Sequence, residues 1–61
     1  MTGADVIVRL RGEGWTVKSQ DATQVKLAKE ERVVIVPIVP DGPLSPGLLQ
    51  AIEKQTGVVL T

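Results

Sequence analysis

The stretch Arg32-Val33-Val34-Ile35-Val36-Pro37 decides how this chain folds. It holds four consecutive β-branched apolar residues and then a proline, which has no N–H to offer a further ladder bond. This pattern predicts a strand that is covered on at least one face. The run is too short to cross a bilayer, because a membrane-spanning helix needs about 20 apolar residues. We therefore expect the core of a small sheet here, and no membrane association.

Length and charge limit what the protein can do. Its 61 residues predict a single domain, spanning 1–61. A domain of this size buries only about 60% of its unfolded surface, so its stability margin is thin and a large active-site cleft is not expected. Seven basic residues balance seven acidic ones. Any binding to nucleic acid must therefore come from a local patch of positive charge.

Several kinds of chemistry are missing from the composition. The chain has no cysteine and no histidine, so it lacks thiolate metal ligands, disulfides and the side chain that most often binds metals or titrates near neutral pH. Phosphate-binding and dinucleotide-binding motifs are also absent. We expect no cofactor, no metal and no small-molecule substrate. The first residues contain neither a basic segment nor a long apolar one, which predicts a cytoplasmic protein without a signal peptide.

Two segments have the periodicity of amphipathic helices. Residues 3–13 follow Thr2, a favourable N-cap residue, and precede Gly14, which can end a helix. The second helix opens at Ser45-Pro46 and ends before Gly57. The apolar residues of each segment fall on one helical face: Val6, Ile7 and Leu10 in the first, and Leu48, Leu49, Ala51 and Ile52 in the second. The tail, residues 58–61, either packs beside the second helix or adds to a sheet edge.

Between the helices the apolar period changes to two, which is typical of strands. Residues 15–20 and 24–29 alternate on either side of a turn signal at 21–23. A second turn at 29–31 leads into the strand that ends at Pro37. The order α-β-β-β-α predicts an α+β two-layer sandwich, in which two helices cover one face of a three-stranded antiparallel sheet.

The two turns also predict how the strands pair. With turns at 21–23 and 29–31, Lys18 faces Lys26, Val25 faces Ile35 and Leu27 faces Val33. The face toward the helices then carries Trp15, Val17, Val25, Leu27, Val33 and Ile35. The open face carries Thr16, Lys18, Gln20, Gln24, Lys26, Val34 and Val36.

The predicted open face has two candidate uses. Two lysines placed opposite each other repel unless an anion lies between them, so this face could contact the phosphates and 2′-hydroxyls of RNA. The candidate RNA-binding residues are Thr16, Lys18, Gln20, Gln24 and Lys26. Val34 and Val36, if exposed, would instead bind a protein partner. An ordinary solvated sheet face with no ligand is the third interpretation.

Three pieces of the chain stand in a recognisable order: Val6-Ile7…Leu10…Gly14-Trp15, then Val33-Val34-Ile35-Val36-Pro37, then Leu44-Ser45-Pro46-Gly47-Leu48-Leu49…Ile52. In type, order and spacing they resemble the HicA (YcfA-like) family of bacterial toxins over nearly the whole chain. The most specific element is residues 44–49. The resemblance implies a fold like that of double-stranded-RNA-binding domains, messenger-RNA cleavage and neutralisation by a HicB antitoxin.

The resemblance also implies a catalytic histidine in the second strand, and this chain has none. By spacing, the family's Gly-Ser-His falls on residues 21–23 or one residue further along, and a further family histidine falls near Val39. Metal-free RNA cleavage needs an acid and a base with pKa values near the working pH. Thr23 cannot serve unaided, and Asp21 would need a large rise in pKa that a surface turn does not supply. We therefore carry over no catalytic residue.

The sequence thus supports a HicA-like domain that has lost the catalytic histidine. The leading hypothesis is an RNA-binding or toxin–antitoxin-related domain without nuclease activity. The alternative is a protein-interaction module with no RNA role, which binds either a HicB-like antitoxin or a second copy of the chain. An active nuclease that uses Asp21 or Thr23 is the third option.

Overall fold

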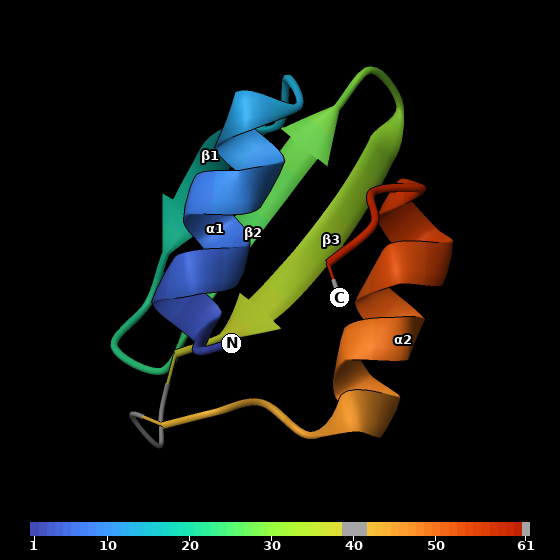
Figure 1. Ribbon diagram of the computed structural model, residues 1–61. Helices are drawn as coiled ribbons and strands as arrows, with labels where there is room; N and C mark the ends of the chain where they lie inside the picture. Colours follow the sequence, from blue (N-terminus) through green and yellow to red (C-terminus); the bar gives the residue numbers. More distant parts are fainter. Residues whose placement is uncertain (39–41, 61) are drawn as a thin grey trace.

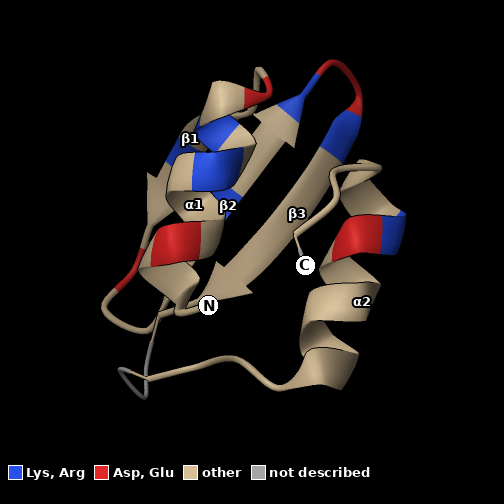
Figure 2. Ribbon diagram, viewed as in Figure 1, with Lys and Arg blue, Asp and Glu red and all other residues tan. Residues whose placement is uncertain are grey.

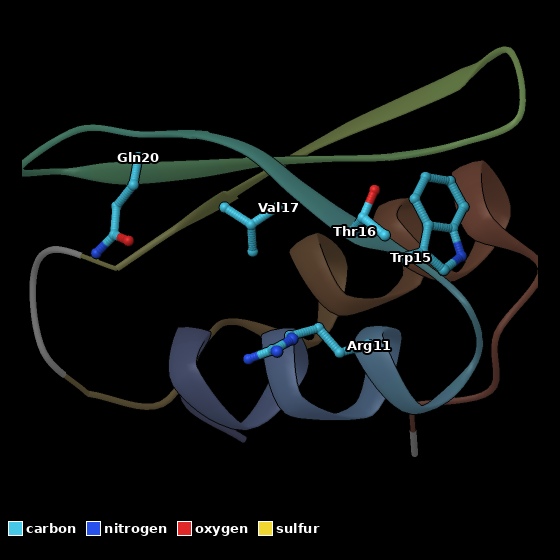
Figure 3. Close-up of a pocket in the computed structure, with 5 residues that line it drawn as sticks. All are labelled: Arg11, Trp15, Thr16, Val17 and Gln20. Carbon is cyan, nitrogen blue, oxygen red and sulfur yellow. The ribbon is translucent and has the colours of Figure 1, made fainter.

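The computed structural model describes residues 1–38 and 42–60. The chain forms α1 (Gly3–Gly12), β1 (Thr16–Gln20), β2 (Gln24–Lys29), β3 (Arg32–Pro37) and α2 (Pro46–Thr56) (Figure 1). The strands pair antiparallel in the order β1-β2-β3. Both helices lie on the same side of the sheet, α1 in front of β1 and β2 and α2 beside β3 (Figures 1 and 3). The predicted α-β-β-β-α order and α+β class are confirmed.

Helix α1 is held at both ends by contacts to its backbone. At its start the Thr2 Oγ1 accepts a hydrogen bond from the Asp5 N–H at 3.2 Å, and Asp5 Oδ2 accepts one from the Thr2 N–H at 3.0 Å. The bond from the Thr2 backbone, helped by the Thr2 side chain, keeps the pKa of the Asp5 carboxyl below its usual value. At the end of the helix, Lys29 Nζ donates to the Glu13 carbonyl at 2.8 Å. The positive charge of Lys29 is favourable there because the C-terminal end of the helix dipole is negative.

Helix α2 begins and ends as its sequence predicts. Ser45 Oγ accepts the Leu48 N–H at 3.2 Å, Pro46 occupies the first turn, and Gly57 takes the left-handed conformation with φ 74°. Beyond Gly57 the chain turns back onto the core. Leu60, which is buried, donates its N–H to Glu53 Oε1 at 2.9 Å, so residues 58–60 pack against the core and do not join the sheet.

The core lies between the helix pair and the sheet. Its fully buried side chains include Val6 and Leu10 of α1, Leu27 of β2 and Ile52 of α2. Trp15, also buried, joins the turn after α1 to this core, and its backbone N–H donates to the Leu10 carbonyl at 3.0 Å. The remaining side chains of this core are Val25, Val34, Val36, Leu49, Val58 and Leu60.

The start of α1 approaches the end of β3 closely. A Cβ atom added to Gly3 would overlap the carbonyl oxygen of Pro37, so only glycine fits at this point. The Met1 carbonyl accepts the Leu44 N–H at 2.7 Å, and Thr2 forms an isolated bridge with Pro43. These contacts join the N-terminus to the segment that leads into α2. No helix in the described ranges, 1–38 and 42–60, is long and apolar enough to span a membrane.

Strand β3 pairs with β2 in a register that differs from the predicted one. The turn consists of two residues, Glu30 and Glu31, so Lys29 pairs directly with Arg32. The sequence predicted a three-residue turn that begins at Lys29. Because side chains alternate with a period of two, this single-residue error turns every side chain of β3 to the opposite face.

The shift exchanges the two sets of β3 side chains. Val34 and Val36 are buried, with exposures of 1% and 0%, so the prediction that they bind a partner from the open face is wrong. Val33 and Ile35, which were expected in the core, are 51% and 48% exposed. The apolar patch on the open face therefore exists, but it consists of the other two residues of the strand.

Strand β1 contains a β-bulge that the sequence did not predict. Val17 pairs with Leu27 as expected, but the register then shifts, and Ser19 pairs with Lys26. Lys18 is the additional residue. The predicted pairing of Lys18 with Lys26 is therefore wrong, because a bulge sets two residues of one strand against a single residue of its partner.

Candidate binding surface

The two helices leave the opposite face of the sheet uncovered (Figure 3). Alternation about the buried residues Val25 and Leu27 places Gln24 and Lys26 on this face. Thr16 lies opposite Ala28 on the same side, and its Oγ1 donates to the Ala28 carbonyl at 3.2 Å. Gln24, Lys26 and Thr16 are all solvent-exposed. Three of the predicted RNA-binding residues therefore share one surface.

The bulge decides where the remaining predicted residues lie. Val17 and Gln20 both point toward α1 (Figure 3). Because they are three positions apart, the alternation is broken between them: Ser19, which pairs with Lys26, lies on the open side, and Lys18 is the unpaired residue of the bulge. Lys18 is exposed and does not lie opposite Lys26, and its place on the open face stays a prediction. Gln20 is not on that face, because the extra residue turns it toward α1, and Ser19 takes the position next to Lys26.

The charges of the sheet are all of one sign. The charged residues of the three strands are Lys18, Lys26, Lys29 and Arg32, and none of these strands contains an aspartate or glutamate. Lys29 points to the helix side, where it reaches the Glu13 carbonyl. Lys26 is a cation of the open face, and Lys18 is exposed at the bulge of β1. The carboxylates closest in sequence lie in the turns at the ends of the strands, at Asp21 and at Glu30 and Glu31 (Figure 2).

The turn between β1 and β2 occupies the position where the resemblance implied a catalytic histidine. Its backbone is fixed by two hydrogen bonds, from the Asp21 N–H to the Gln24 carbonyl at 2.8 Å and from the Ile38 N–H to the Thr23 carbonyl at 2.9 Å. Asp21, Ala22, Thr23 and Gln24 are all exposed. No imidazole is available in this chain to exchange a proton here. The second position considered for a histidine, Val39, lies outside the described residues.

A crevice that the sequence did not predict separates α1 from β1. It has a volume of about 490 Å³ and is lined by Arg11, Trp15, Thr16, Val17 and Gln20 (Figure 3). Val17 was expected in the core but is 42% exposed at this crevice. The crevice holds one cation and no carboxylate. Among residues 1–38 and 42–60, no cluster of acidic, histidine or cysteine side chains could hold a metal ion.

The fold is a small α+β domain, and its sheet presents exposed lysine and apolar residues on the face opposite the two helices. A family model described as HicA toxin of bacterial toxin-antitoxin matches residues 3–58. The chain therefore belongs to the HicA toxin family, and the resemblance read from its motifs is confirmed. No curated protein and no solved structure matches it.

Proposed function

We propose that this toxin–antitoxin-related domain binds RNA with its open sheet face and does not cleave it by the histidine mechanism of its family. The observation that supports the proposal is the single sign of charge in the sheet: Lys18 and Lys26 are exposed, and the three strands contain no aspartate or glutamate. Ammonium groups with neighbouring hydroxyl and amide groups are the usual partners of RNA phosphates and 2′-hydroxyls. The contributing residues are Thr16, Lys18, Ser19, Gln24 and Lys26.

The surface favours contact with the RNA backbone over recognition of bases. The one aromatic residue of the chain is Trp15, which is buried and cannot stack on a base. Binding that relies on two lysines is weak, tolerant of sequence and strongly dependent on salt.

The absence of cleavage follows from the absence of a suitable proton donor and acceptor. The turn at Asp21 and Thr23 is exposed and the chain has no histidine, so this turn lacks the imidazole that would exchange protons with the RNA. General acid–base help is typically worth about 10²–10⁴-fold in rate. We expect the purified chain to leave RNA intact. Thr23→His and Gln24→His cover the two positions to which spacing assigns the family's histidine, and cleavage by either variant would identify the lost group.

Binding is tested by fluorescence anisotropy with a labelled RNA duplex at low salt. The double variant Lys18→Glu with Lys26→Glu should no longer bind the RNA. For the parent, a plot of log Kd against log salt concentration should have a slope of about 2, because two lysines contact phosphates. The matched control is Arg9→Glu with Lys54→Glu, which changes the net charge equally but on the exposed helix surfaces. No binding by the parent, or equal loss in the control, contradicts the proposal.

A second candidate function is protein binding without any role for RNA. The observation that favours it is the half-exposed pair Val33 and Ile35, which lies beside the lysines on the open face. The partner is either a HicB-like antitoxin or a second copy of the chain. If the domain binds only a protein, Lys18 and Lys26 are not needed for its function and the parent should not bind the labelled RNA. The anisotropy measurement described above therefore distinguishes the two candidate functions.

A further inference from the structure

The outer edge of β3 has backbone groups that point away from the sheet. The Ile38 N–H donates to the Thr23 carbonyl, which fixes this pair as hydrogen-bonded. In an antiparallel ladder bonded and non-bonded pairs alternate, so the bonded pairs of β3 are those of Arg32, Val34 and Val36. The N–H and C=O groups of Val33 and Ile35 therefore point outward. Within residues 1–38 and 42–60, no backbone bond from a loop, cap or tail reaches either residue.

The side chains of this edge are apolar as well. Val33 and Ile35 are exposed on the open face, and β3 pairs with β2 without a bulge over its whole length. Natural edge strands are usually protected by a bulge, by a lysine in the strand or by a covering segment. Strand β1 has the first two of these features, in the bulge at Lys18. Between Val33 and Val36, β3 has neither.

We propose that the β3 edge pairs with the β3 edge of a second copy of this chain, as antiparallel strands centred on Val34. Val33 then lies opposite Ile35 of the second copy, and Ile35 opposite Val33. Each of these two pairs joins residues whose N–H and C=O groups point outward, so both pairs can exchange backbone hydrogen bonds. The result is one continuous sheet formed from two three-stranded sheets, with helices on one face of each half.

A second copy fits this edge because the edge is complementary to itself. The outward positions pair one β-branched side chain with another, which is a favourable combination across strands. On either side of them Arg32 falls opposite Val36 and Glu31 opposite Pro37, so no like charges meet. A domain of this size also gains stability that its own core cannot supply. The inference names the partner in the second candidate function and does not depend on RNA binding.

The test is the oligomeric state, measured by sedimentation equilibrium from micromolar to millimolar protein. The parent should approach the mass of a dimer as the concentration rises. Val33→Lys with Ile35→Lys should remain a monomer throughout, because each pair would then place two ammonium groups opposite each other. Ser19→Lys with Gln24→Lys adds the same charge to exposed positions of the same face and should dimerise like the parent. A parent that stays monomeric at all concentrations overturns the proposal, as does a β3 variant that dimerises.

The register of the proposed strand pairing is tested by disulfide cross-linking, which does not change the charge of the edge. Because the chain has no cysteine, single Val33→Cys and Ile35→Cys variants each carry one thiol. Hydrogen-bonded antiparallel pairs have Cα atoms about 5.5 Å apart, within the range that a disulfide can bridge. A mixture of the two variants should cross-link faster than either variant alone. Faster cross-linking within one variant overturns the proposed register, and no cross-linking at millimolar concentration overturns the pairing. Neither measurement involves Lys18 or Lys26, so failure here leaves RNA binding unaffected.

Discussion

The two edges of this sheet differ in nearly every property. Strand β1 is exposed at all five of its positions and contains a bulge. Strand β3 pairs regularly, and its Val34 and Val36 are buried against the helices. Both strands have exactly one neighbour in the sheet, yet only β3 contributes large side chains to the core.

The difference shows that the two edges of the sheet in this domain of 61 residues contribute unequally to the core. On the β3 side, Gly3 of α1 packs against Pro37, and α2 also contacts this strand. The β1 side needs little packing and can hold lysine and other polar residues. Substitutions of the buried β3 residues should therefore change the free energy of unfolding, and substitutions at the exposed positions of β1 should change the proposed RNA binding.

Gly3→Ala should produce the largest loss of stability, because it separates β3 from α1. The added methyl group overlaps the Pro37 carbonyl oxygen, and neither backbone can move without losing the packing of the helix. We expect the free energy of unfolding to fall by about 3 kcal/mol, measured by urea denaturation. Gly12→Ala in the same helix meets no atom within 4 Å and serves as the control. Equal effects of the two substitutions would mean that α1 does not hold the end of β3.

The sequence predicted the elements of this fold well because each has a local signal. Thr2 and Ser45 as N-caps, Gly57 after the second helix and Pro37 at the end of β3 all mark boundaries that the structure confirms. Two helices and three strands between such markers leave few ways to build two layers. The helical core residues Val6 and Leu10 followed from their spacing alone.

The candidate site was predicted only in part because it depends on register. The turn Glu30-Glu31 has none of the glycine or asparagine that identifies a two-residue hairpin, and Glu30 adopts φ 57° without such a signal. The bulge at Lys18 likewise has no signal in the residue types around it. Each error moved residues between faces: Val34 and Val36 into the core, and Gln20 toward α1. Thr16, Gln24 and Lys26 stayed on the open face.

Two alanine substitutions in β3 should show which of its side chains are buried, because each changes the free energy of unfolding by an amount that depends on burial. Val34→Ala removes methyl groups from a fully buried side chain and should lower the free energy of unfolding by about 2 kcal/mol. Val33→Ala removes the same atoms from a half-exposed side chain and should cost less than about 1 kcal/mol when measured at low protein concentration. Val17→Ala in β1 should resemble Val33→Ala. If Val33→Ala lowered the free energy of unfolding more than Val34→Ala, the β3 register predicted from the sequence would be correct and the register described here would be wrong.

The smallest effect we predict is a gain in stability at the turn that sets the β3 register. Glu30 holds a left-handed conformation that is unfavourable for a residue with a Cβ by about 1–2 kcal/mol. Glycine removes this strain but has more conformational freedom to lose on folding, so Glu30→Gly should raise the free energy of unfolding by at most about 1 kcal/mol. Glu31→Gly removes the same charge from a position without positive φ, and it should lower stability. Thermal denaturation of the two variants distinguishes the effect of the backbone from that of the charge. If both variants shifted Tm in the same direction, the effect would come from the lost charge and not from the backbone strain at Glu30. The left-handed conformation of Glu30 would then not determine the stability of this turn.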